Sequence, residues 1–226
     1  MPAPGFEAQL AHFHEAMASG KRRLGWKVAF NDPAAQARFG LSAPPIGWID
    51  ADQYHASGAN VAIGPAQRVA VEAEVMLTMG RDVRGDDPLD SLRAAIASVS
   101  PAIELVDYSR SGQEIADIVE HSFFHFATIY GEPAAEIPAD AELLADSTTK
   151  NGEPAAECIP GRVPKDLAEI VRLVASTLDE VGEQLLAGDR IICGSYIAPF
   201  PVVAGDTASA RYRNGIGPVA VTIAGK

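Results

Sequence analysis

In residues 69–77, apolar and polar side chains alternate as they do in a β-strand, whose successive side chains point to opposite faces. One face is apolar and consists of Val69, Val71, Ala73, Val75 and Leu77. Glu72 and Glu74 share the other face with Met76, and a third glutamate, Glu104, lies in the apolar run 101–106. The pattern therefore predicts two strands that carry three carboxylates.

The rest of the chain divides into short elements by the same alternation and by apolar residues spaced three or four apart. Helices are predicted at 5–19, 33–39, 88–98, 113–121 and 165–186. Further strands are predicted at 24–30, 47–50, 123–130, 190–195 and within 210–225. Because strands outnumber helices and do not alternate regularly with them, we expect an α+β fold with a large mixed sheet.

The 226 residues are many for one domain and few for two, and no repeat, low-complexity tract or linker divides them. We expect one domain over 1–226, with a short N-terminal helical segment at 1–22. Hydrophobic residues make up 47% of the chain and charged residues 21%, which is typical of a globular protein. The formal net charge of -12 argues against nucleic acid and anionic membranes as partners, because both bind basic surfaces.

Compartment and membrane signals are few. Cys158 and Cys193 are far apart and form neither a metal-type pair nor a disulfide framework. The N-terminus has no basic region followed by an apolar core, and no apolar run approaches the ~18 residues of a membrane span. We therefore expect a soluble, cytoplasmic protein.

Two interpretations of the three glutamates are open at this point. Carboxylates on apolar strands repel one another and are costly to bury unpaired, and a hard divalent cation such as Mg²⁺ or Mn²⁺ resolves both problems. Alternatively, Glu72 and Glu74 lie on a solvated outer face and pair with basic residues across the sheet. Lys27 on the apolar strand 24–30 is similarly ambiguous, because it suits either a pocket cation or an edge-strand lysine beside a surface acid.

The order of several segments along the chain is more specific than any one of them. From about Gly25 to the C-terminus, this order resembles the 2-keto-4-pentenoate hydratase and 4-oxalocrotonate decarboxylase family, within the fumarylacetoacetate hydrolase superfamily. The segments are GWKVAF (25–30), PPIGWI (44–49), VEAEVMLTMGRDV (71–83), PAIELVDYS (101–109), LLAGDRIICGS (185–195) and VVAGD (202–206).

This resemblance implies a fold, a metal site and a pocket. The fold would be a mixed β roll with flanking helices, and the members usually form homo-oligomers. The metal ligands would be Glu72, Glu74 and Glu104 on one Mg²⁺ or Mn²⁺. Lys27 would reach into the same pocket, close to the substrate carboxylate, and help proton transfer. The turn at Gly194 and Ser195 would line the substrate carboxylate site.

The chain also departs from the family pattern in two places. Pro45 stands where hydratases often carry an acidic residue, two positions before the glycine that corresponds to Gly47. The segment 119–125 replaces a segment of small polar residues. Within it, His121 could take over proton transfer, although an ordinary histidine in a pocket wall is the simpler interpretation. His121 and His125 have a metal-ligand spacing, but no further zinc ligand lies nearby in the sequence.

These observations predict a catalytic domain that is a divalent-metal-dependent lyase for a small 2-oxo or 2-hydroxydienoic acid, as in the catabolism of aromatic compounds. A 2-oxo acid can chelate the metal, which acts on it as a Lewis acid. Hydration and decarboxylation are the first candidates, and Pro45 favours decarboxylation because that reaction needs no water-activating base. A metal-dependent hydrolase that cleaves a C–C bond of acylpyruvates and a non-catalytic, small-acid-binding relative are the alternatives.

Overall fold

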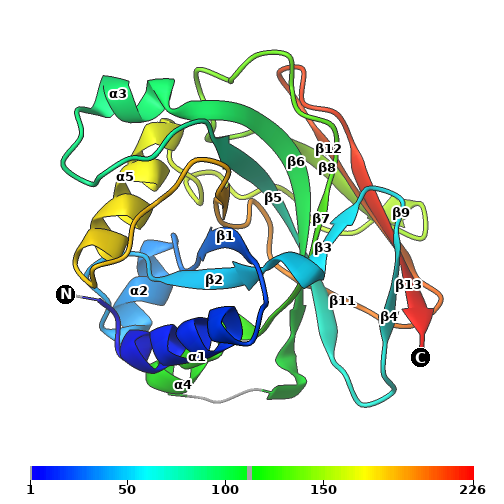
Figure 1. Ribbon diagram of the computed structural model, residues 1–226. Coiled ribbons are helices and arrows are strands. Elements are labelled where there is room, and N and C mark those ends of the chain that lie inside the picture. Colours follow the sequence, from blue (N-terminus) through cyan, green and yellow to red (C-terminus); the bar gives the residue numbers. More distant parts are fainter. Residues whose placement is uncertain (1, 111–113) are drawn as a thin grey trace.

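The structure, a computed structural model, describes residues 2–110 and 114–226. In this part of the chain, two β-sheets face each other and the helices lie outside them (Figure 1). The larger sheet has eight strands in the order β2-β1-β10-β5-β6-β7-β3, with β11 paired to β5. Its strands are β1 (Arg23–Val28), β2 (Ile46–Asp50), β3 (Tyr54–Ala56), β5 (Val69–Met79), β6 (Ile96–Asp107), β7 (His125–Tyr130), β10 (Arg190–Ile192) and β11 (Phe200–Val202).

The smaller sheet has five strands in the order β4-β13-β12-β8-β9. They are β4 (Asn60–Ile63), β8 (Ala145–Lys150), β9 (Glu153–Pro154), β12 (Thr207–Tyr212) and β13 (Val219–Gly225). The pairs β1–β10, β3–β7 and β4–β13 are parallel and the other pairs are antiparallel. The expected α+β fold with a mixed sheet is confirmed.

Five α-helices flank the sheets in the described residues. They are α1 (Phe6–Ala18), α2 (Pro33–Phe39), α3 (Leu89–Ala94), α4 (Ile115–Glu120) and α5 (Leu167–Asp179). Helix α1 packs against α4 and β2, and α3 packs against α5. Helix α2 has the ends that the sequence predicts, because the Asp32 side chain accepts a hydrogen bond from the Ala34 amide and Gly40 ends the helix with φ 66°.

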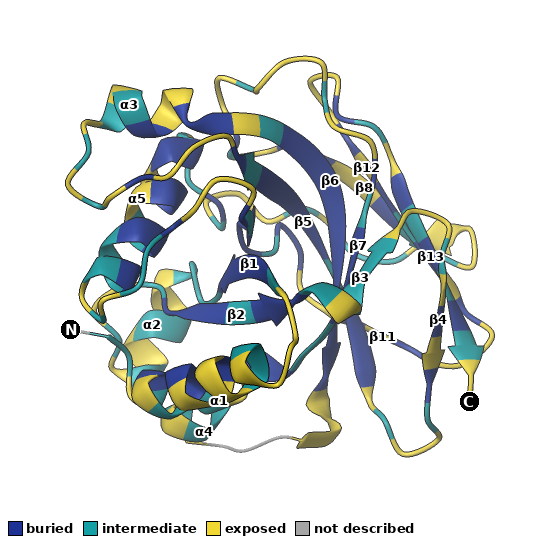
Figure 2. Ribbon diagram, in the orientation of Figure 1, coloured by how far each residue is buried: buried dark blue, intermediate teal, exposed yellow. Residues whose placement is uncertain are grey.

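Strands β5 and β6 lie at the centre of the larger sheet and are buried along most of their length (Figure 2). One hydrophobic cluster connects both sheets with α5 and includes Leu77, Val174 and Val219. A side chain that points from β5 or β6 therefore enters the interior, so any charge on these strands needs a specific partner. The assignment of 1–226 to one domain remains a prediction.

The register of four neighbouring strands brings distant residues to one face of the sheet. Glu72 lies opposite Glu104 across β5 and β6. Ile192 of β10 lies opposite Met76, which is two residues from Glu74, and Lys27 of β1 lies opposite Ile192. Because paired residues and residues two apart share a face, the sheet itself directs the lysine and the three glutamates to the same side.

Several predicted boundaries are wrong; the strand predicted at 190–195, for example, ends at Ile192. Helix α3 ends at Ala94, not near 98, because the chain from Ile96 pairs with the upper part of β5. Helix α5 ends at Asp179, not at 186, and Gly182 follows with φ 79°. Strand β7 starts at His125, two residues later than predicted, because Ser122–Phe124 form a 3₁₀ turn. Residue 113 of the predicted helix 113–121 lies outside the described residues.

Both cysteines, Cys158 and Cys193, are free thiols, as expected. In the described part of the chain, none of the helices is both long and apolar enough to cross a membrane.

Candidate metal centre and pocket

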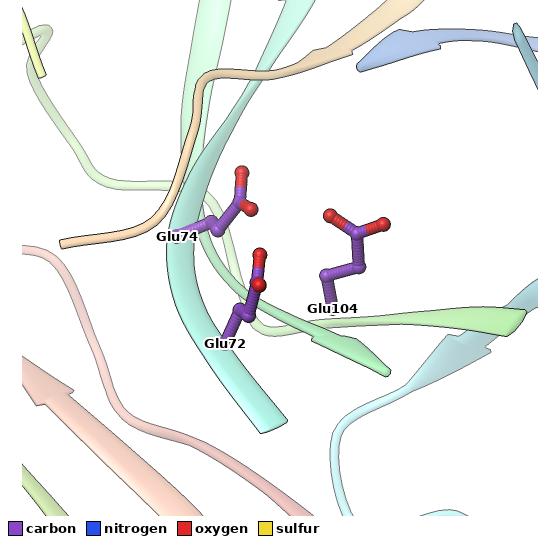
Figure 3. A group of neighbouring side chains, drawn as sticks. All are labelled: Glu72, Glu74 and Glu104. Carbon is purple, nitrogen blue, oxygen red and sulfur yellow. The ribbon is translucent and has the colours of Figure 1, made fainter. Parts of the chain in front are cut away.

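Glu72 and Glu74 on β5 and Glu104 on β6 direct their carboxylates into the same space (Figure 3). One carboxylate oxygen from each residue lies within 4.8 Å of the other two. Glu74 and Glu104 are buried, and Glu72 is partly exposed to a pocket. The register described above explains this convergence, which two short sequence segments could only suggest.

Glu104 is held by two side chains that both contact its Oε1 atom. The Lys27 ammonium donates a hydrogen bond to this oxygen, and Nδ1 of His125 lies 2.8 Å from it. The other oxygen, Oε2, is buried and has no hydrogen-bond partner in the described structure. A buried carboxylate oxygen without a partner is rare, and it provides a free ligand atom in the cluster.

The charges of the cluster are unbalanced without a cation. Burial and then the charge of Glu104 raise the pKa of Glu72 to about 7, and the same causes raise the pKa of Glu74 well above its usual value. Burial also opposes ionisation of Glu104, but Lys27 and His125 hold its pKa at about 2. With all three glutamates ionised, Lys27 balances one of three negative charges. A divalent cation would balance the remaining two.

The donor set fits a hard divalent cation. All candidate ligand atoms are carboxylate oxygens, which Mg²⁺ and Mn²⁺ prefer. The amide of Gly194 donates a 2.7 Å hydrogen bond to Oε2 of Glu74 and orients this carboxylate. In the described residues, this is the one group of three or more His, Cys, Asp or Glu side chains with spacing suited to a metal.

A cavity of about 580 Å³ adjoins the cluster. Its polar wall includes Lys27, Glu72, Asn31, Arg162, Gly194 and Ser195. Asn31 donates a 2.8 Å hydrogen bond to the Cys193 carbonyl, and this contact fixes the turn that precedes Gly194. Arg162 donates to the Ile197 carbonyl at 2.7 Å, and its charge lowers the pKa of Glu72 in opposition to the stronger effect of burial. The cavity is thus suited to an anion.

The structure brings most of the predicted site residues together. The three glutamates converge, Lys27 contacts Glu104, and Gly194 and Ser195 line the cavity beside Glu72. The alternative of a lysine paired with a surface acid is wrong, because Lys27 is 3% exposed and its partner Glu104 is fully buried. The solvated outer face proposed for Glu72 and Glu74 is also wrong, because Glu74 is buried and Glu72 is only partly exposed.

His121 lies apart from this group. Its Nδ1 atom is 2.9 Å from the Asp117 carbonyl oxygen, its side chain is 39% exposed, and it lines a second cavity of about 200 Å³. His125 lines that second cavity as well, and it is the histidine that contacts Glu104. The role predicted for His121 in proton transfer therefore finds no support in these contacts.

The sequence interpretation missed the contact of His125 with Glu104 and the place of Arg162 in the pocket. His125 lies within the predicted strand 123–130, which pairs with the strand of Glu104, and this neighbourhood was the available signal. Arg162 lies between β9 and α5, where no pattern indicates which way a side chain points. Pro45 lines neither cavity, and its carbonyl accepts a 3.0 Å hydrogen bond from the Ala29 amide.

No family model matches the chain, but individual known proteins are similar to it in sequence and structure. The TodF product hydratase of Pseudomonas putida strain F1 is 24% identical over 223 residues, which cover 97% of this chain and 83% of that protein. Among solved structures, 4-oxalocrotonate decarboxylase from Pseudomonas putida G7, complexed with magnesium and adipate, has a TM-score of 0.85 at 25% identity. This match covers 97% of this chain and 84% of that one.

A third match extends the likeness in fold to a hydrolase. Fumarylpyruvate hydrolase from Pseudomonas aeruginosa, in complex with Mn²⁺ and pyruvate, has a TM-score of 0.69 at 18% identity, over 91% of this chain and 90% of that one. The chain thus has the fold of the fumarylacetoacetate hydrolase superfamily, with a candidate metal centre of three glutamates. Over most of its length, it is a homologue of the 2-keto-4-pentenoate hydratase and 4-oxalocrotonate decarboxylase family, as the order of motifs predicted.

Proposed function

We propose that this protein is a Mg²⁺- or Mn²⁺-dependent lyase that acts on a small 2-oxo or 2-hydroxydienoic acid. The observation that carries this proposal is the set of three converging glutamates beside a pocket that also contains Lys27 and Arg162. The solved relatives support it, because one is complexed with magnesium and adipate and another with Mn²⁺ and pyruvate. Glu72, Glu74 and Glu104 would hold the cation, which supplies Lewis-acid polarisation of the substrate's 2-oxo group.

The residues of the pocket would bind and orient the acid. The positive charges of Lys27 and Arg162 attract the substrate carboxylate, and the turn at Gly194 and Ser195 forms the adjoining wall. Phe123 closes the pocket near the lysine, with its ring centroid 5.6 Å from Nζ, and excludes water from that ammonium. In this dry environment, electrostatic attraction is stronger than in bulk water.

Lys27 would also move a proton. Its ammonium lies on the cavity wall and hydrogen-bonds to Glu104, so a proton at Nζ is available to a substrate carbon that becomes electron-rich. Although burial acts against the charged form, Glu104 and the other two glutamates raise the pKa of Lys27 above its usual value. The ammonium form is therefore present at neutral pH and acts as a proton donor.

Decarboxylation is the reaction that this pocket supports best. Hydration needs a group that activates water close to the carbon that accepts it. Proline cannot supply that group, and Pro45 lies outside the lining of both cavities. Loss of CO₂ needs an electron sink and a proton donor: the 2-oxo group, polarised by a cation that the three glutamates would hold, would supply the first, and Lys27 would supply the second.

Three assays with Mg²⁺ and purified protein test the proposal. The substrates are a 2-oxo-3-enedioate for decarboxylation, 2-hydroxypenta-2,4-dienoate for hydration and an acylpyruvate for C–C cleavage. We expect decarboxylation to be fastest and to disappear in EDTA and in Glu74→Gln. Rapid hydration would refute the argument from Pro45, rapid acylpyruvate cleavage would assign the protein as a hydrolase, and full turnover in EDTA would refute the metal centre. Homo-oligomer formation remains a prediction.

A further inference from the structure

The pocket beside the glutamates has an apolar wall in addition to the polar one. Four phenylalanines line it, at positions 30, 39, 123 and 124, together with Val106 and Ile118. The volume of the cavity is about 580 Å³. A small acid held at the cluster, Lys27 and Arg162 would contact the polar wall. The aromatic wall would then face water, and covering it with an apolar group is favourable.

The phenylalanines form a connected aromatic wall. The ring centroids of Phe30 and Phe39 are 5.1 Å apart, and those of Phe30 and Phe123 are 5.5 Å apart at an interplanar angle of 86°. These rings come from three separate segments, namely the end of β1, helix α2 and the turn before β7. Offset and edge-to-face contacts of this kind hold aromatic rings in place, so the wall is preformed.

The backbone of this wall adopts an unfavourable conformation. Phe30, Phe123 and Phe124 have φ values of 54°, 57° and 60°, in the left-handed region that bulky residues rarely adopt. Such conformations persist where the surrounding structure enforces them, and they cluster at ligand sites. All three residues line the same cavity. The strain therefore serves to place aromatic rings opposite the carboxylate-binding wall.

We propose that the substrate is a 2-oxo or 2-hydroxydienoic acid whose carbon chain carries a bulky apolar substituent, such as an aryl or branched alkyl group, beyond the carboxylate held at the cluster. The second carboxylate, which decarboxylation releases, would lie beside this substituent. The proposal rests on the proposed function and extends it to a substrate class. The acid end would lie at the cluster with Lys27 and Arg162, and the substituent would lie against Phe30, Phe39 and Phe123. Burial of an apolar group against these rings provides the affinity.

A second carboxylate without an apolar substituent is the alternative occupant of the aromatic end. The cation available there is Arg38, which is exposed on α2, with its guanidinium carbon 5.1 Å from the Phe39 ring centroid. This stacking leaves Arg38 solvated, so it adds less to binding than a buried cation would. The structure therefore favours an apolar substituent at the aromatic end over a second carboxylate alone.

Calorimetric titration of the protein with 2-oxo acids in millimolar Mg²⁺ tests whether the pocket binds an apolar substituent. We compare pyruvate, 4-phenyl-2-oxobutanoate and 2-oxoadipate. We expect the phenyl compound to bind at least roughly tenfold more tightly than pyruvate, from burial of the ring. Phe39→Ala should remove most of this gain without changing the Kd for pyruvate. Leu143→Ala, an exposed apolar residue outside the pocket, should change neither Kd.

The outcomes separate the two proposals. Equal affinity for pyruvate and the phenyl compound would overturn the proposal of an apolar substituent, and so would tightest binding of 2-oxoadipate that weakens in Arg38→Gln. In both cases, Mg²⁺-dependent binding of pyruvate would leave the proposed function standing. If none of the three acids binds in a Mg²⁺-dependent way, both proposals fail. If Phe39→Ala does not fold, Phe30→Leu provides the same comparison with a smaller change in volume.

Discussion

Replacement of Lys27 by methionine tests whether the buried ion pair with Glu104 stabilises the fold and takes part in turnover. The change retains the volume of the side chain and removes its charge. Lys27 is 3% exposed and Glu104 is fully buried, so water cannot replace the lost partner. His125 would then be the remaining group that hydrogen-bonds to the carboxylate. Removal of one partner from a buried pair leaves an uncompensated charge, which is strongly destabilising.

The magnitude follows from the pKa of Glu104. Although burial favours the protonated acid, the Lys27 charge and then the His125 hydrogen bond lower this pKa from 4.5 to about 2. A difference of about 2.5 units corresponds to ~3 kcal/mol, since each unit is worth 1.36 kcal/mol. This value is an upper estimate for Lys27, because His125 shares the effect. In a chain of this length, ~3 kcal/mol lowers the melting temperature by roughly 6–12 °C.

The assay is thermal unfolding in EDTA at neutral pH, together with turnover in Mg²⁺. A lowered pKa stabilises the fold above pH 4.5, and the effect is lost as the pH falls towards 2, so neutral pH shows all of it. Lys165→Met is the matched control, because Lys165 pairs with Glu142 at 3.3 Å but its side chain is 70% exposed. We expect Lys165→Met to lower the free energy of unfolding by less than about 1 kcal/mol. For Lys27→Met, turnover should fall by ~100-fold.

Equal melting temperatures for wild type and Lys27→Met would refute the reasoning about the buried pair. Wild-type turnover in the variant would separately remove Lys27 from the mechanism.

Three further changes test the site. Millimolar Mg²⁺ or Mn²⁺ should raise the melting temperature, because a ligand that binds only the native state stabilises it. The double variant Glu72→Gln with Glu74→Gln should abolish this rise. An unchanged rise in the double variant would argue against the metal centre. His125→Ala should destabilise the fold by roughly 1–3 kcal/mol and reduce turnover, since it removes a hydrogen bond to a buried carboxylate, whereas the free energy of unfolding of the exposed His121→Ala should change by less than about 0.5 kcal/mol. Urea denaturation measures both changes, and a larger loss of turnover in His121→Ala than in His125→Ala would restore the role predicted for His121. Arg162→Gln should raise KM about tenfold or more with a smaller change in kcat, and steady-state kinetics that show an unchanged KM would exclude Arg162 from substrate binding.

The metal centre could be predicted from the sequence because a strand has a fixed period. Glu72 and Glu74 share a face of β5 whatever the rest of the fold, and the apolar residues around them fix that face inside the molecule. Alternation alone does not indicate which strands pair, so the proximity of Glu104 could be predicted only with the order of motifs along the chain. Alternation and motif order together also predicted the position of Lys27.

Sequence patterns were less informative where the backbone is irregular. His121 and His125 are four residues apart, a spacing that would bring them together on a helix. Instead, α4 ends before them and the residues Ser122–Phe124 all have positive φ, so the chain turns sharply. Both histidines line the second cavity, but it is the His125 ring that contacts Glu104. Bulky residues in this conformation are not predictable from propensity, because tertiary contacts enforce it. The end of helix α3 is a similar case, in which strand pairing takes precedence over the local pattern. The residues after Ala94 have helical spacing, but they pair with β5 and extend β6 instead.

The charged side chains of the pocket lie on regular strands, whereas its aromatic wall lies on a short helix and on turns. This difference determines how the substrate specificity of the pocket can change. The glutamates and Lys27 belong to the central strands, whose register fixes four charged side chains at once, so a shift of one strand would disrupt the whole cluster. The aromatic wall belongs to α2 and to turns outside the sheet, which can change without altering that register. Gly47 connects the two parts: an added Cβ would lie 3.1 Å from the Phe123 ring and 3.2 Å from Cγ of Lys27. A larger residue at this position would therefore displace the lysine together with the aromatic wall, which makes Gly47→Ala a change that couples proton donation to recognition of the apolar substituent.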